Sequence, residues 1–542
     1  MAFFIGIDVG TGSARAGVFD SEGNLKSTAA QAIETYRPQE NFAQQSSSEI
    51  WQAVCTATKT AIADANISSS EVVGMGFDAT CSLVVTDANG GPVSVDPAGL
   101  THQNVMLWMD HRAIEDANEI NAIGGSVLKH VGGRISPEME LPKLRWMKRE
   151  LPQSWQNAAQ FWDLPDWLVH RATNSFTRSL CSTVCKWTYL GHKGLAGEGW
   201  DDDFLSSIGL KDLVADEHAS IGSTLSVPGE RCGVLTEQSA AELGLAAGIA
   251  VSASLIDAYA GALGTLGLDI GESPIDSRLA VIAGTSTCHI AFNTKPIFVP
   301  GVWGPYFGVT LPDMWALEGG QSAAGVLMDA VVARHSASVP LAIEAKKQGK
   351  RISDLIEDRL TSMAEETAFL TSTRHVQPDF HGNRSPLAEP WRKGAVVGLG
   401  MSAGLDDLAL DYLATIQALA YGTRHIIEEM RAQGAVINTL VMSGGLARNT
   451  LYVREHADAT GCKVLVPDQQ EPVLLGCAML GAVAAGEFTD LRQAMKVMSG
   501  QGRMVEPRQG SINNYHNNKY KVFRKMQDDY SKYNAMMMTK EK

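Results

Sequence analysis

The N-terminal strand–turn–strand pattern constrains the fold more than any other feature of this sequence. Residues Phe3–Val9 alternate as in a β-strand, Gly10-Thr11-Gly12-Ser13 predicts a tight turn, and Ala14–Asp20 predicts a second strand. A dinucleotide-binding fingerprint needs a strand, a glycine-rich turn and a helix, with a third glycine where Arg15 stands. The P-loop motif G-x-x-x-x-G-K-S/T is also missing from the sequence. The opening segment therefore disfavours both of these nucleotide-binding folds and indicates a hairpin.

The same pattern returns near the middle of the chain. Predicted strands Leu279–Ala283 and Cys288–Phe292 flank a turn with the sequence Gly284-Thr285-Ser286-Thr287. Two such hairpins, one at the start of each half, indicate a duplicated architecture. Further along, residues 440–449 are typical of a strand, a glycine turn at Gly444-Gly445 and a helix.

The length of the chain predicts two large domains. The sequence has 542 residues, whereas a single hydrophobic core stops growing at roughly 250–300 residues. We place the boundary in the glycine-containing segment 264–271, which gives domains of residues 1–266 and 267–495 and a tail of residues 496–542. Helices are predicted over Ser47–Ala65, with Ser48 as N-cap, and over Leu408–Gln433. Beyond about Tyr515, the tail predicts a surface helix followed by disorder.

Charge and composition narrow the class of partners. The net charge of −15 disfavours nucleic acids and anionic membranes, because phosphate-rich partners are bound by clustered Lys and Arg. The eight cysteines include no C-x-x-C pair, which favours free thiols in a reducing compartment. No basic segment opens the sequence and no apolar run reaches about 18 residues. We therefore expect a cytoplasmic protein without a membrane-spanning helix.

The two Gly/Thr/Ser turns are candidate phosphate sites. Such a turn directs several backbone N–H groups and hydroxyls at one point, which forms an anion-binding nest. One turn alone would be an ordinary hairpin, but two of them with Asp8 and Gly444-Gly445 favour a polyphosphate such as ATP. The candidates are Thr11, Gly12 and Ser13 with Arg15 as a nearby cation at one end, and Gly284, Thr285 and Ser286 at the other.

Several segments together resemble the FGGY family of carbohydrate kinases, which belongs to the actin-like ATPase superfamily. They extend over nearly the whole chain, from Ile5 to about Gly486. The resemblance implies an α/β fold of two actin-like, ribonuclease H-like ATPase domains that flank a cleft for nucleotide and sugar, with ATP and Mg²⁺ required. The matching residues are Gly-Ile-Asp-Val-Gly-Thr-Gly-Ser at 6–13, Gly-Phe-Asp-Ala-Thr-Cys-Ser at 76–82, Leu-Trp-Met-Asp-His-Arg-Ala at 107–113, Asp257, Ala-Gly-Thr-Ser-Thr at 283–287, Glu-Gly-Gly-Gln-Ser at 318–322, Phe-His-Gly-Asn-Arg-Ser-Pro at 380–386 and Ser-Gly-Gly-Leu-Ala-Arg-Asn at 443–449.

The resemblance assigns the chemical step to two carboxylates. Asp257 follows an apolar strand and precedes a helix of small residues, and its position corresponds to the catalytic base of the family. Asp8 corresponds to a residue that contacts Mg²⁺ through water, and Asp257 is a second candidate for the metal. The alternatives are structural: Asp257 could act only as a helix cap, and Asp8 could only shape its own turn.

For the sugar, the resemblance favours the ribulokinase branch. Glycerol kinases carry Arg-Glu near residues 78–81 and xylulokinases carry Met-His, whereas this chain has Asp-Ala-Thr-Cys. At the positions of Lys186 and Glu318, ribulokinases contact the ketopentose. Two assignments have structural alternatives, because Asp110 could have a structural role and Cys81 could be core packing that lines the pocket. The neighbouring His111 and Arg112 could form a structural salt-bridge cluster. The candidate sugar ligands, expected mostly from the first domain, are Asp78, Cys81, Asp110, Lys186, Asp257 and Glu318.

The second domain is expected to bind the adenine nucleotide. Gly444 and Gly445 lack a Cβ, so a flat ring can approach their backbone, and Asn449 can offer its amide to the base. Gly325 resembles the family position that lies close to the nucleotide. The alternative for Gly444-Gly445 is an ordinary turn between a strand and a helix.

The pattern as a whole predicts phosphorylation of D-ribulose to D-ribulose 5-phosphate. Alternatives are a kinase for L-ribulose, xylulose, ribitol or glycerol, an actin-like ATPase without kinase activity, and a sugar-responsive transcriptional regulator. A homodimer is compatible with the resemblance. In the loop after residue 380, Glu389 stands where the family pattern predicts Asp, and we expect this loop to have a structural role.

Overall fold

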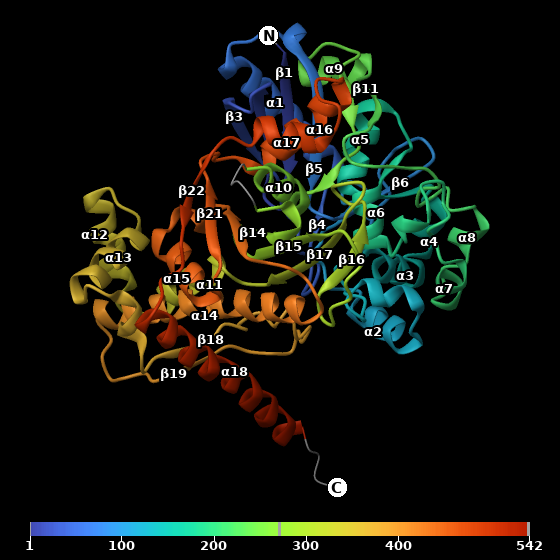
Figure 1. Cartoon of the computed structure of the whole chain (residues 1–542). Helices are drawn as coiled ribbons and strands as arrows, with labels where there is room; N and C mark the ends of the chain where they lie inside the picture. Colours follow the sequence, from blue (N-terminus) through green and yellow to red (C-terminus); the bar gives the residue numbers. More distant parts are fainter. Residues whose placement is uncertain (1, 269–272, 539–542) are drawn as a thin grey trace.

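Two large β-sheets organise the chain, and the computed structural model describes residues 2–268 and 273–538 of it (Figure 1). The first sheet has the order β11-β12-β5-β1-β2-β3, with β13 also paired to β5, and the second has the order β16-β17-β15-β14-β20-β21-β22. The strands of the first are β1 (Phe3–Val9), β2 (Ser13–Asp20), β3 (Leu25–Ala32), β5 (Val72–Ala79), β11 (Arg231–Val234), β12 (Ala250–Ser252) and β13 (Leu255–Ile256). Those of the second are β14 (Arg278–Ala283), β15 (Thr287–Asn293), β16 (Trp303–Phe307), β17 (Trp315–Gln321), β20 (Thr439–Ser443), β21 (Lys463–Pro467) and β22 (Gly502–Val505).

The two sheets share one pairing scheme. Strand β1 is antiparallel to β2 and parallel to β5, and β14 is likewise antiparallel to β15 and parallel to β20. The predicted hairpins are therefore confirmed, because each Gly/Thr/Ser turn joins the first two strands of its sheet. The duplication also places the two turns at equivalent positions of the two sheets.

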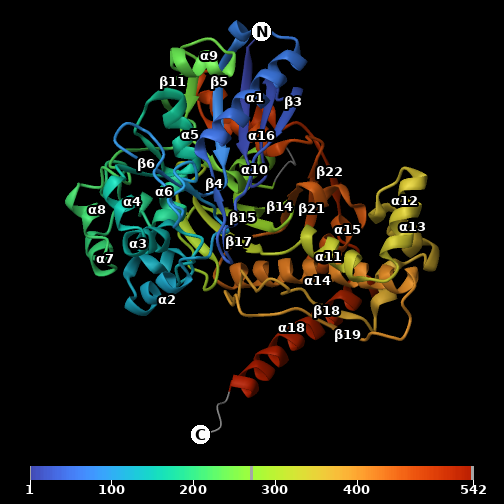
Figure 2. The ribbon, with the colours of Figure 1, turned by 180° about the vertical axis from the view of Figure 1, so that it is seen from behind.

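Two helices that pack against each other lie between the sheets (Figures 1 and 2). Helix α10 (Asp257–Leu266) packs on β14, and α16 (Pro472–Ala485) packs on β1 and β5. Glycines permit this close approach: a Cβ on Gly6 would lie 1.9 Å from the Leu474 carbonyl oxygen, and one on Gly476 would lie 2.1 Å from that of Ala260. Each half of the chain therefore contributes a helix to the sheet of the other half.

Helices also cover the outer faces of both sheets. Helix α1 (Ser47–Ala65) packs on β2 and β3, while α14 (Leu405–Ala432) and α15 (Thr450–Thr460) pack beside the second sheet. The α1 range agrees with the prediction, but its N-cap is Ser46, whose side chain accepts from the Glu49 N–H, rather than Ser48. The other α-helices are α2 (Ile114–Ile123), α3 (Glu140–Glu150), α4 (Pro152–Asn157), α5 (Leu164–Thr173), α6 (Leu180–Trp187), α7 (Asp202–Ser207), α8 (Asp212–Ala215), α9 (Glu237–Leu243), α11 (Gly325–Arg334), α12 (Ser338–Gln348), α13 (Ile352–Met363) and α17 (Leu491–Met498).

Shorter strands form three small sheets among the described residues. The order β4-β7-β6-β8 makes up one, and the pairs β9–β10 and β18–β19 make up the others. Their bounds are β4 (Gln44–Gln45), β6 (Leu83–Thr86), β7 (Val105–Met106), β8 (Gln160–Asp163), β9 (Arg178–Ser179), β10 (Leu225–Ser226), β18 (His375–Gln377) and β19 (Ala395–Val397).

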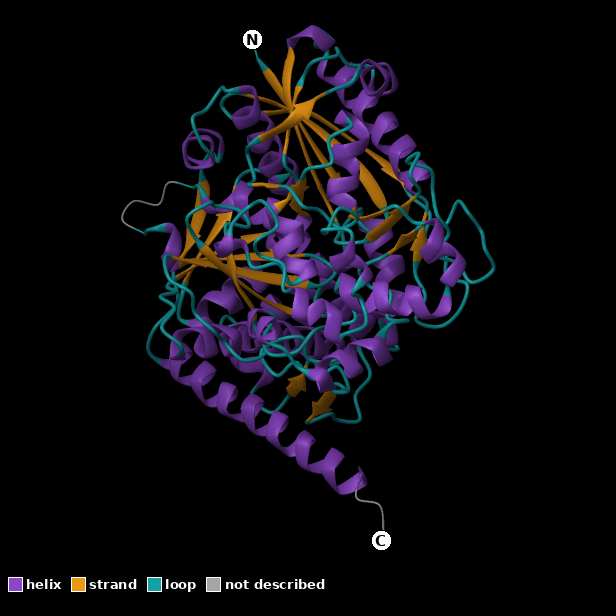
Figure 3. Cartoon of the chain, turned by 90° about the vertical axis from the view of Figure 1, so that its right-hand side faces the viewer, coloured by secondary structure: helices purple, strands orange, loops and turns teal. Residues whose placement is uncertain are grey.

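The tail forms one long helix, α18 (Ser511–Met538), whose last turns extend beyond the body of the protein (Figure 3). The helix begins before Tyr515 and is more than a surface element, because His516, Tyr520 and Phe523 are buried against the second half. The predicted disorder falls on residues 539–542 at the extreme end, which lie outside the described residues. The predicted domain boundary includes residues 269–272, which also lie outside them.

Among the described residues, no single helix is long and apolar enough to cross a membrane. The pair α11 and α12 meets those criteria only jointly, with a bend of 111° between the two helices.

Candidate functional site

Three carboxylates meet at the ends of neighbouring strands of the first sheet. Strands β1 and β5 are parallel and in register, so Asp8 lies beside Asp78. Strand β13 runs along β5 and places Leu255 beside Asp78, after which Asp257 begins α10. Asp78 lies within β5, and its side chain is fully buried. The sheet therefore presents Asp8, Asp78 and Asp257 as one group.

Burial and neighbouring charges raise the pKa of two of these carboxylates, Asp257 and Asp78. Burial, and then the charge of Asp8, raises the pKa of Asp257 to about 7. Burial raises the pKa of Asp78 well above its usual range, and the charge of Asp8 adds to this, while a hydrogen bond from the Cys477 thiol to Asp78 Oδ2 at 2.7 Å opposes it. With a pKa of about 7, Asp257 is close to the balance between charged and protonated forms that suits a general base at neutral pH.

Arg15 links the first turn to the helix between the sheets. Its Nε donates to Asp8 Oδ2 at 2.8 Å, and its Nη1 donates to Glu471 Oε2 at 2.8 Å. Glu471 directly precedes α16 and was not identified from the sequence. The guanidinium lies beside the turn, as predicted for a nucleotide-binding cation, and two carboxylates hold it there.

Hydrogen bonds from within the first half of the chain fix the first turn. The Gly10 N–H donates to the Ser13 carbonyl at 3.0 Å, which closes the turn. The Thr11 carbonyl accepts from Gln45 Nε2 at 2.7 Å and from the Thr35 hydroxyl at 3.5 Å, and the Thr11 hydroxyl accepts from Trp108 Nε1 at 3.0 Å. Gly12 is exposed, and a Cβ there would meet no atom within 4 Å. The tip of the turn is therefore open for a ligand.

The second turn is also closed by an internal hydrogen bond, which spans one residue fewer. The Gly284 N–H donates to the Ser286 carbonyl at 2.9 Å. The start of α11 packs against it, because the Gly325 N–H donates to the Gly284 carbonyl at 3.0 Å. A Cβ on Gly325 would lie 2.7 Å from that carbonyl oxygen, so only glycine fits without a shift. Gly325 therefore packs against the second turn, while its predicted place close to the nucleotide stays a prediction.

A large cleft opens beside the second turn. It encloses about 820 Å³, a size typical of small-molecule sites. Its apolar wall is formed by α11, α12 and the start of α13, and Tyr412 of α14 also lines it. The predicted nucleotide-binding residues that line this cleft are Gly284, Thr285, Gly325, Gly445 and Asn449.

Gly444 and Asn449, two of the nucleotide candidates, are held closely by neighbouring residues. Gly444 has a φ of 89°, and a Cβ there would lie 2.5 Å from the Ala283 carbonyl oxygen. Asn449 caps α15 by accepting from the Tyr452 N–H at 2.7 Å, and its Nδ2 donates to the Tyr412 hydroxyl at 3.2 Å. The Asn449 amide therefore keeps one N–H donor for a ligand.

Glu318 and Lys186 meet at an aromatic ring between the two halves. Glu318 on β17 accepts from Arg384 Nη2 at 2.6 Å and from the Tyr259 hydroxyl at 3.1 Å. The Lys186 ammonium and the Arg384 guanidinium each lie 4.4 Å from the centre of the Trp303 ring. Tyr259 is on α10, the helix that Asp257 begins, so this polar group lies beside the carboxylates. Lys186 and Tyr259 of this group come from the first half of the chain, and Trp303, Glu318 and Arg384 come from the second.

Asp257 lies close enough to Lys186 and Glu318 for their charges to act on its pKa. Lys186 lowers the pKa of Asp257 and Glu318 raises it, although both effects are smaller than that of burial. Cys81 is buried, and burial raises the pKa of its thiol against the opposing charge of Lys186. Cys81 also packs in the apolar core, so both the pocket and the core interpretation describe its surroundings.

Two family models match nearly the whole chain. The model of the N-terminal domain of the FGGY family of carbohydrate kinases matches residues 3–264, and that of the C-terminal domain matches residues 279–485. The chain belongs to the FGGY family of carbohydrate kinases. It is therefore a carbohydrate kinase, and ATP is its co-substrate.

Relatives of this FGGY kinase agree with the fold. An FGGY carbohydrate kinase domain-containing protein of Homo sapiens is 47% identical and covers 99% of this chain and 98% of its own length. A D-ribulokinase of Saccharomyces cerevisiae is 40% identical and covers 92% of this chain and 74% of its own. A solved "xyloylose kinase" from Brucella ovis has a TM-score of 0.79 at 20% identity and covers 98% and 100% of the two chains. The predicted actin-like, two-domain α/β fold is confirmed.

The hydrogen bonds of Asp110 do not match its predicted role as a sugar ligand. Its side chain is fully buried, and Oδ1 accepts from the Arg112 N–H and Nε, at 3.1 and 2.8 Å. Its Oδ2 accepts from Arg112 Nη2 and the Ala43 N–H, at 2.6 and 2.7 Å. These donors in the described part of the chain fill about four lone-pair positions of a carboxylate. The geometry therefore favours the structural alternative for Asp110.

Sequence reasoning missed Tyr259, Trp303 and Arg384 as members of the polar group. Arg384 lies in the segment 380–386 that supported the family resemblance, but we expected this loop to be structural only. Tyr259 could have been found from its place two residues after Asp257 on the same helix. Trp303 carried no local signal, because only the pairing of β16 with β17 brings it beside Glu318.

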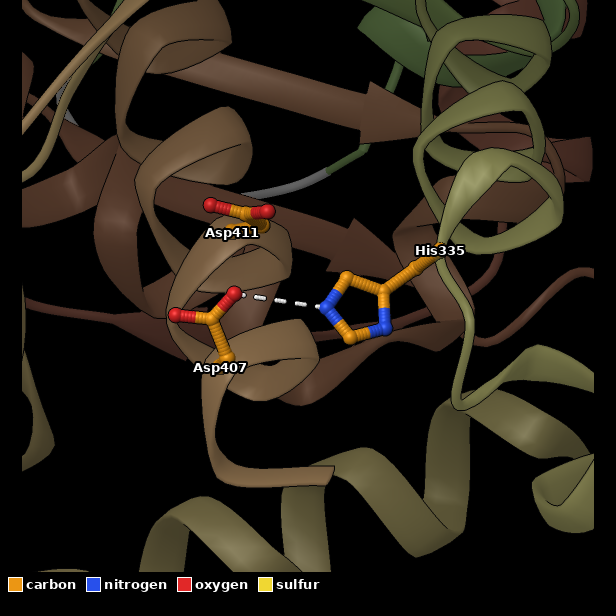
Figure 4. Close-up of side chains that lie close together, drawn as sticks. All are labelled: His335, Asp407 and Asp411. Atoms are coloured by element: carbon orange, nitrogen blue, oxygen red, sulfur yellow. Dashed lines mark hydrogen bonds and ion pairs between the residues drawn. The ribbon is translucent and has the colours of Figure 1, made fainter. Parts of the chain in front are cut away.

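A group of potential metal ligands lies at the opposite end of α11 from Gly325. Figure 4 shows His335 facing Asp407 and Asp411 of α14, with ligand atoms within 4.8 Å of one another. His335 Nδ1 accepts from the Ala337 N–H, so its Nε2 donates to Asp407, 3.3 Å away. Arg374 donates to both carboxylates, at 2.9 and 2.6 Å. We interpret the group as an ion-pair cluster that joins α11, α14 and the start of β18.

Proposed function

We propose that this kinase transfers the γ-phosphoryl group of ATP to the 5-hydroxyl of D-ribulose. The observation that carries the proposal is the convergence of Asp257, Lys186 and Glu318 in one polar group between the two halves of the chain. A buried polyol needs such converging groups, since each hydroxyl left unpaired costs about 1–3 kcal/mol. The 40% identity to a D-ribulokinase supports ribulose over other sugars of the same class.

In the proposed reaction, Asp257 is the general base. Its carboxylate accepts the proton of the 5-hydroxyl while the hydroxyl oxygen forms a bond to the γ-phosphorus of ATP. The bond from this phosphorus to the β–γ bridging oxygen breaks, and ADP leaves with that oxygen. The two glycine turns supply N–H donors for the phosphates. Closure of the cleft would exclude water and limit ATP hydrolysis.

Mg²⁺ fits the carboxylate group. Magnesium prefers one or two carboxylates together with phosphate oxygens and retained waters, and Asp8 and Asp257 offer carboxylates beside the first turn. These two residues would hold the ion, with Asp8 acting through a bound water. When bound, Mg²⁺ neutralises negative charge on the β- and γ-phosphates.

A substrate panel tests the proposal. ADP release would be measured with Mg²⁺ and ATP against D-ribulose, L-ribulose, D-xylulose, L-xylulose, ribitol, arabitol and glycerol. We expect the highest kcat/KM with D-ribulose and formation of D-ribulose 5-phosphate. Turnover of another sugar alone would retain the mechanism and reject D-ribulose. Sugar-independent ATP hydrolysis without a phosphorylated product would reject the proposed reaction.

A further inference from the structure

The loop between β18 and β19 (residues 378–394, here the Arg384 loop) brings a cation to the polar group. Arg384 donates to Glu318 Oε1 at 2.6 Å, lies over Trp303 and directs Nη1 toward Cys288 Sγ at 3.6 Å. Its side chain is 15% exposed, so it is held inside the protein yet retains open surface. Glu318, one of the proposed sugar ligands, therefore depends on this loop for its charged partner, Arg384.

The Arg384 loop is closed on itself. The Asn383 N–H donates to the Glu389 carbonyl at 3.0 Å, and the Glu389 N–H donates back to the Asn383 carbonyl at 2.8 Å. Asn383 Oδ1 also accepts from the Leu387 N–H at 3.0 Å. Arg384 follows directly on this bridge, so the bridge fixes where its side chain starts. A displacement of the segment 389–392 would therefore be carried to Arg384.

That segment is anchored on the C-terminal helix α18. Arg392 is almost fully buried; its Nη1 donates to the Gln527 carbonyl at 3.0 Å, its Nη2 donates to the Ser531 hydroxyl, and its Nε donates to Glu389. The Trp391 ring stacks on Tyr530 at a centroid distance of 6.1 Å. The guanidinium thus connects α18 to the residue that closes the loop.

The helix also contacts the part of the loop that carries Arg384. A small space of about 20 Å³ separates the two and is lined by Asn383, Arg384 and Ser385 of the loop and by Phe523 and Gln527 of α18. Phe523 is buried, so this part of the helix is fixed to the body. The inner half of α18 therefore lies against the Arg384 loop on two sides, at Arg392 and at Arg384.

We propose that α18 supports the sugar site: Arg384 is a further specificity-determining residue, and Arg392, which is anchored on α18, positions the loop that presents it. This inference rests on the proposed kinase function. Arg384 and Glu318 form a donor–acceptor pair, which matches a sugar hydroxyl because a hydroxyl both donates and accepts. The tail that the sequence left without a role would then set the geometry of substrate binding.

Steady-state kinetics with separate titrations of sugar and ATP test this role. We expect Arg384→Gln to raise the KM for D-ribulose about 10- to 100-fold, the range of one hydrogen bond to a charged group. Arg392→Gln, which touches no substrate, should raise it about 5- to 20-fold, because the loop then samples other positions. The KM for ATP should change less than about twofold in both variants, because the nucleotide cleft is lined by other elements.

Asn517→Ala, a variant of α18 away from the Arg384 loop, is the matched control. It removes the hydrogen bond from Arg424 to Asn517 at 2.8 Å and leaves the Arg384 loop untouched. Its KM for D-ribulose should equal that of the wild type. Hydrogen–deuterium exchange of residues 378–394 gives a readout besides activity: exchange should be faster in Arg392→Gln than in Asn517→Ala.

The possible failures are distinguishable. An unchanged sugar KM in folded Arg384→Gln and Arg392→Gln, in an enzyme that phosphorylates D-ribulose, would overturn this inference alone. A wild-type enzyme that phosphorylates no sugar of the panel would reject the proposed function and the inference with it. If Arg392→Gln does not fold, Ser531→Ala and Tyr530→Ala weaken the same anchor, and an unchanged sugar KM in both would overturn the inference.

Discussion

At the scale of single residues, the protonation of Asp257 controls the proposed reaction. Burial removes water that would stabilise the charged carboxylate, and the negative charge of Asp8 adds to this effect. The resulting pKa of about 7 leaves the carboxylate part charged and part protonated under neutral conditions. A base with a pKa near the working pH combines a charged fraction with a strong tendency to take a proton.

The pH profile of the sugar kinetics should therefore report Asp257. Only the charged carboxylate accepts a proton, so kcat/KM for D-ribulose should rise with pH and level off above about 7. Initial rates at constant ionic strength from pH 5 to 9 measure the profile. Asp257→Asn serves as the control and should lose roughly 10²–10⁴-fold in kcat while ATP still binds. A flat profile, or near-normal turnover by Asp257→Asn, would contradict the assignment of the base.

Motifs predicted part of the site and packing determined the rest. Asp257, Lys186 and Glu318 were predicted because each lies in a segment that resembles the family, and the structure brings them together. The motif around Asp110 could not show that Arg112 and Ala43 supply its hydrogen-bond donors. A local pattern identifies the residue type at a position, but the partners of that residue come from distant segments.

At the scale of elements, the contact between α10 and α16 depends on glycine. A Cβ on Gly476 of α16 would lie 2.1 Å from the Ala260 carbonyl oxygen of α10, and one on Gly264 of α10 would lie 1.9 Å from the Pro472 carbonyl oxygen. Both distances are too short for any side chain, and the obstructing atoms belong to backbone that cannot rotate away. The helices could separate only by disturbing the sheets on which they pack.

Gly476→Ala should therefore destabilise the protein strongly. Alanine normally stabilises a helix relative to glycine by about 0.5–1 kcal/mol, but overpacking here should cost roughly 3 kcal/mol or more. Thermal unfolding would measure the change. Gly404→Ala, at a glycine before α14 where a Cβ meets no atom within 4 Å, is the matched control and should leave the melting temperature nearly unchanged. Equal melting temperatures for the two variants would contradict the proposed interlock.

Local periodicity predicted the elements better than their ends. Strand β1 and helix α1 have the predicted ranges, and β14, β15 and α14 differ by a few residues. The predicted N-cap of α1 was two residues late because three consecutive serines, Ser46, Ser47 and Ser48, are all good caps. The choice depends on the register of the helix against the sheet, which a serine run does not encode.

At the scale of the whole molecule, the two halves are not independent bodies. Helix α16 belongs to the second half of the sequence but covers the first sheet, where Leu474 packs on Gly6 and Gly17. The sequence predicted two domains in succession and could not show this exchange, because the sequence of a buried apolar helix does not indicate which sheet the helix packs on. The polar group between the halves therefore depends on both helices.

This exchange predicts that residues 1–266 do not fold alone. Without α16, the first half would lose four apolar side chains from the core cluster that it shares with this helix, all fully buried in the intact chain: Leu474, Leu475, Met479 and Leu480. Burial of four such side chains contributes roughly 6–12 kcal/mol, which is comparable to the whole stability of a domain. Circular dichroism during heating should show no cooperative transition for residues 1–266, and co-expression with residues 267–542 should restore one. A sharp transition for residues 1–266 alone would mean that the first half forms an autonomous core and that α16 adds only to the interface.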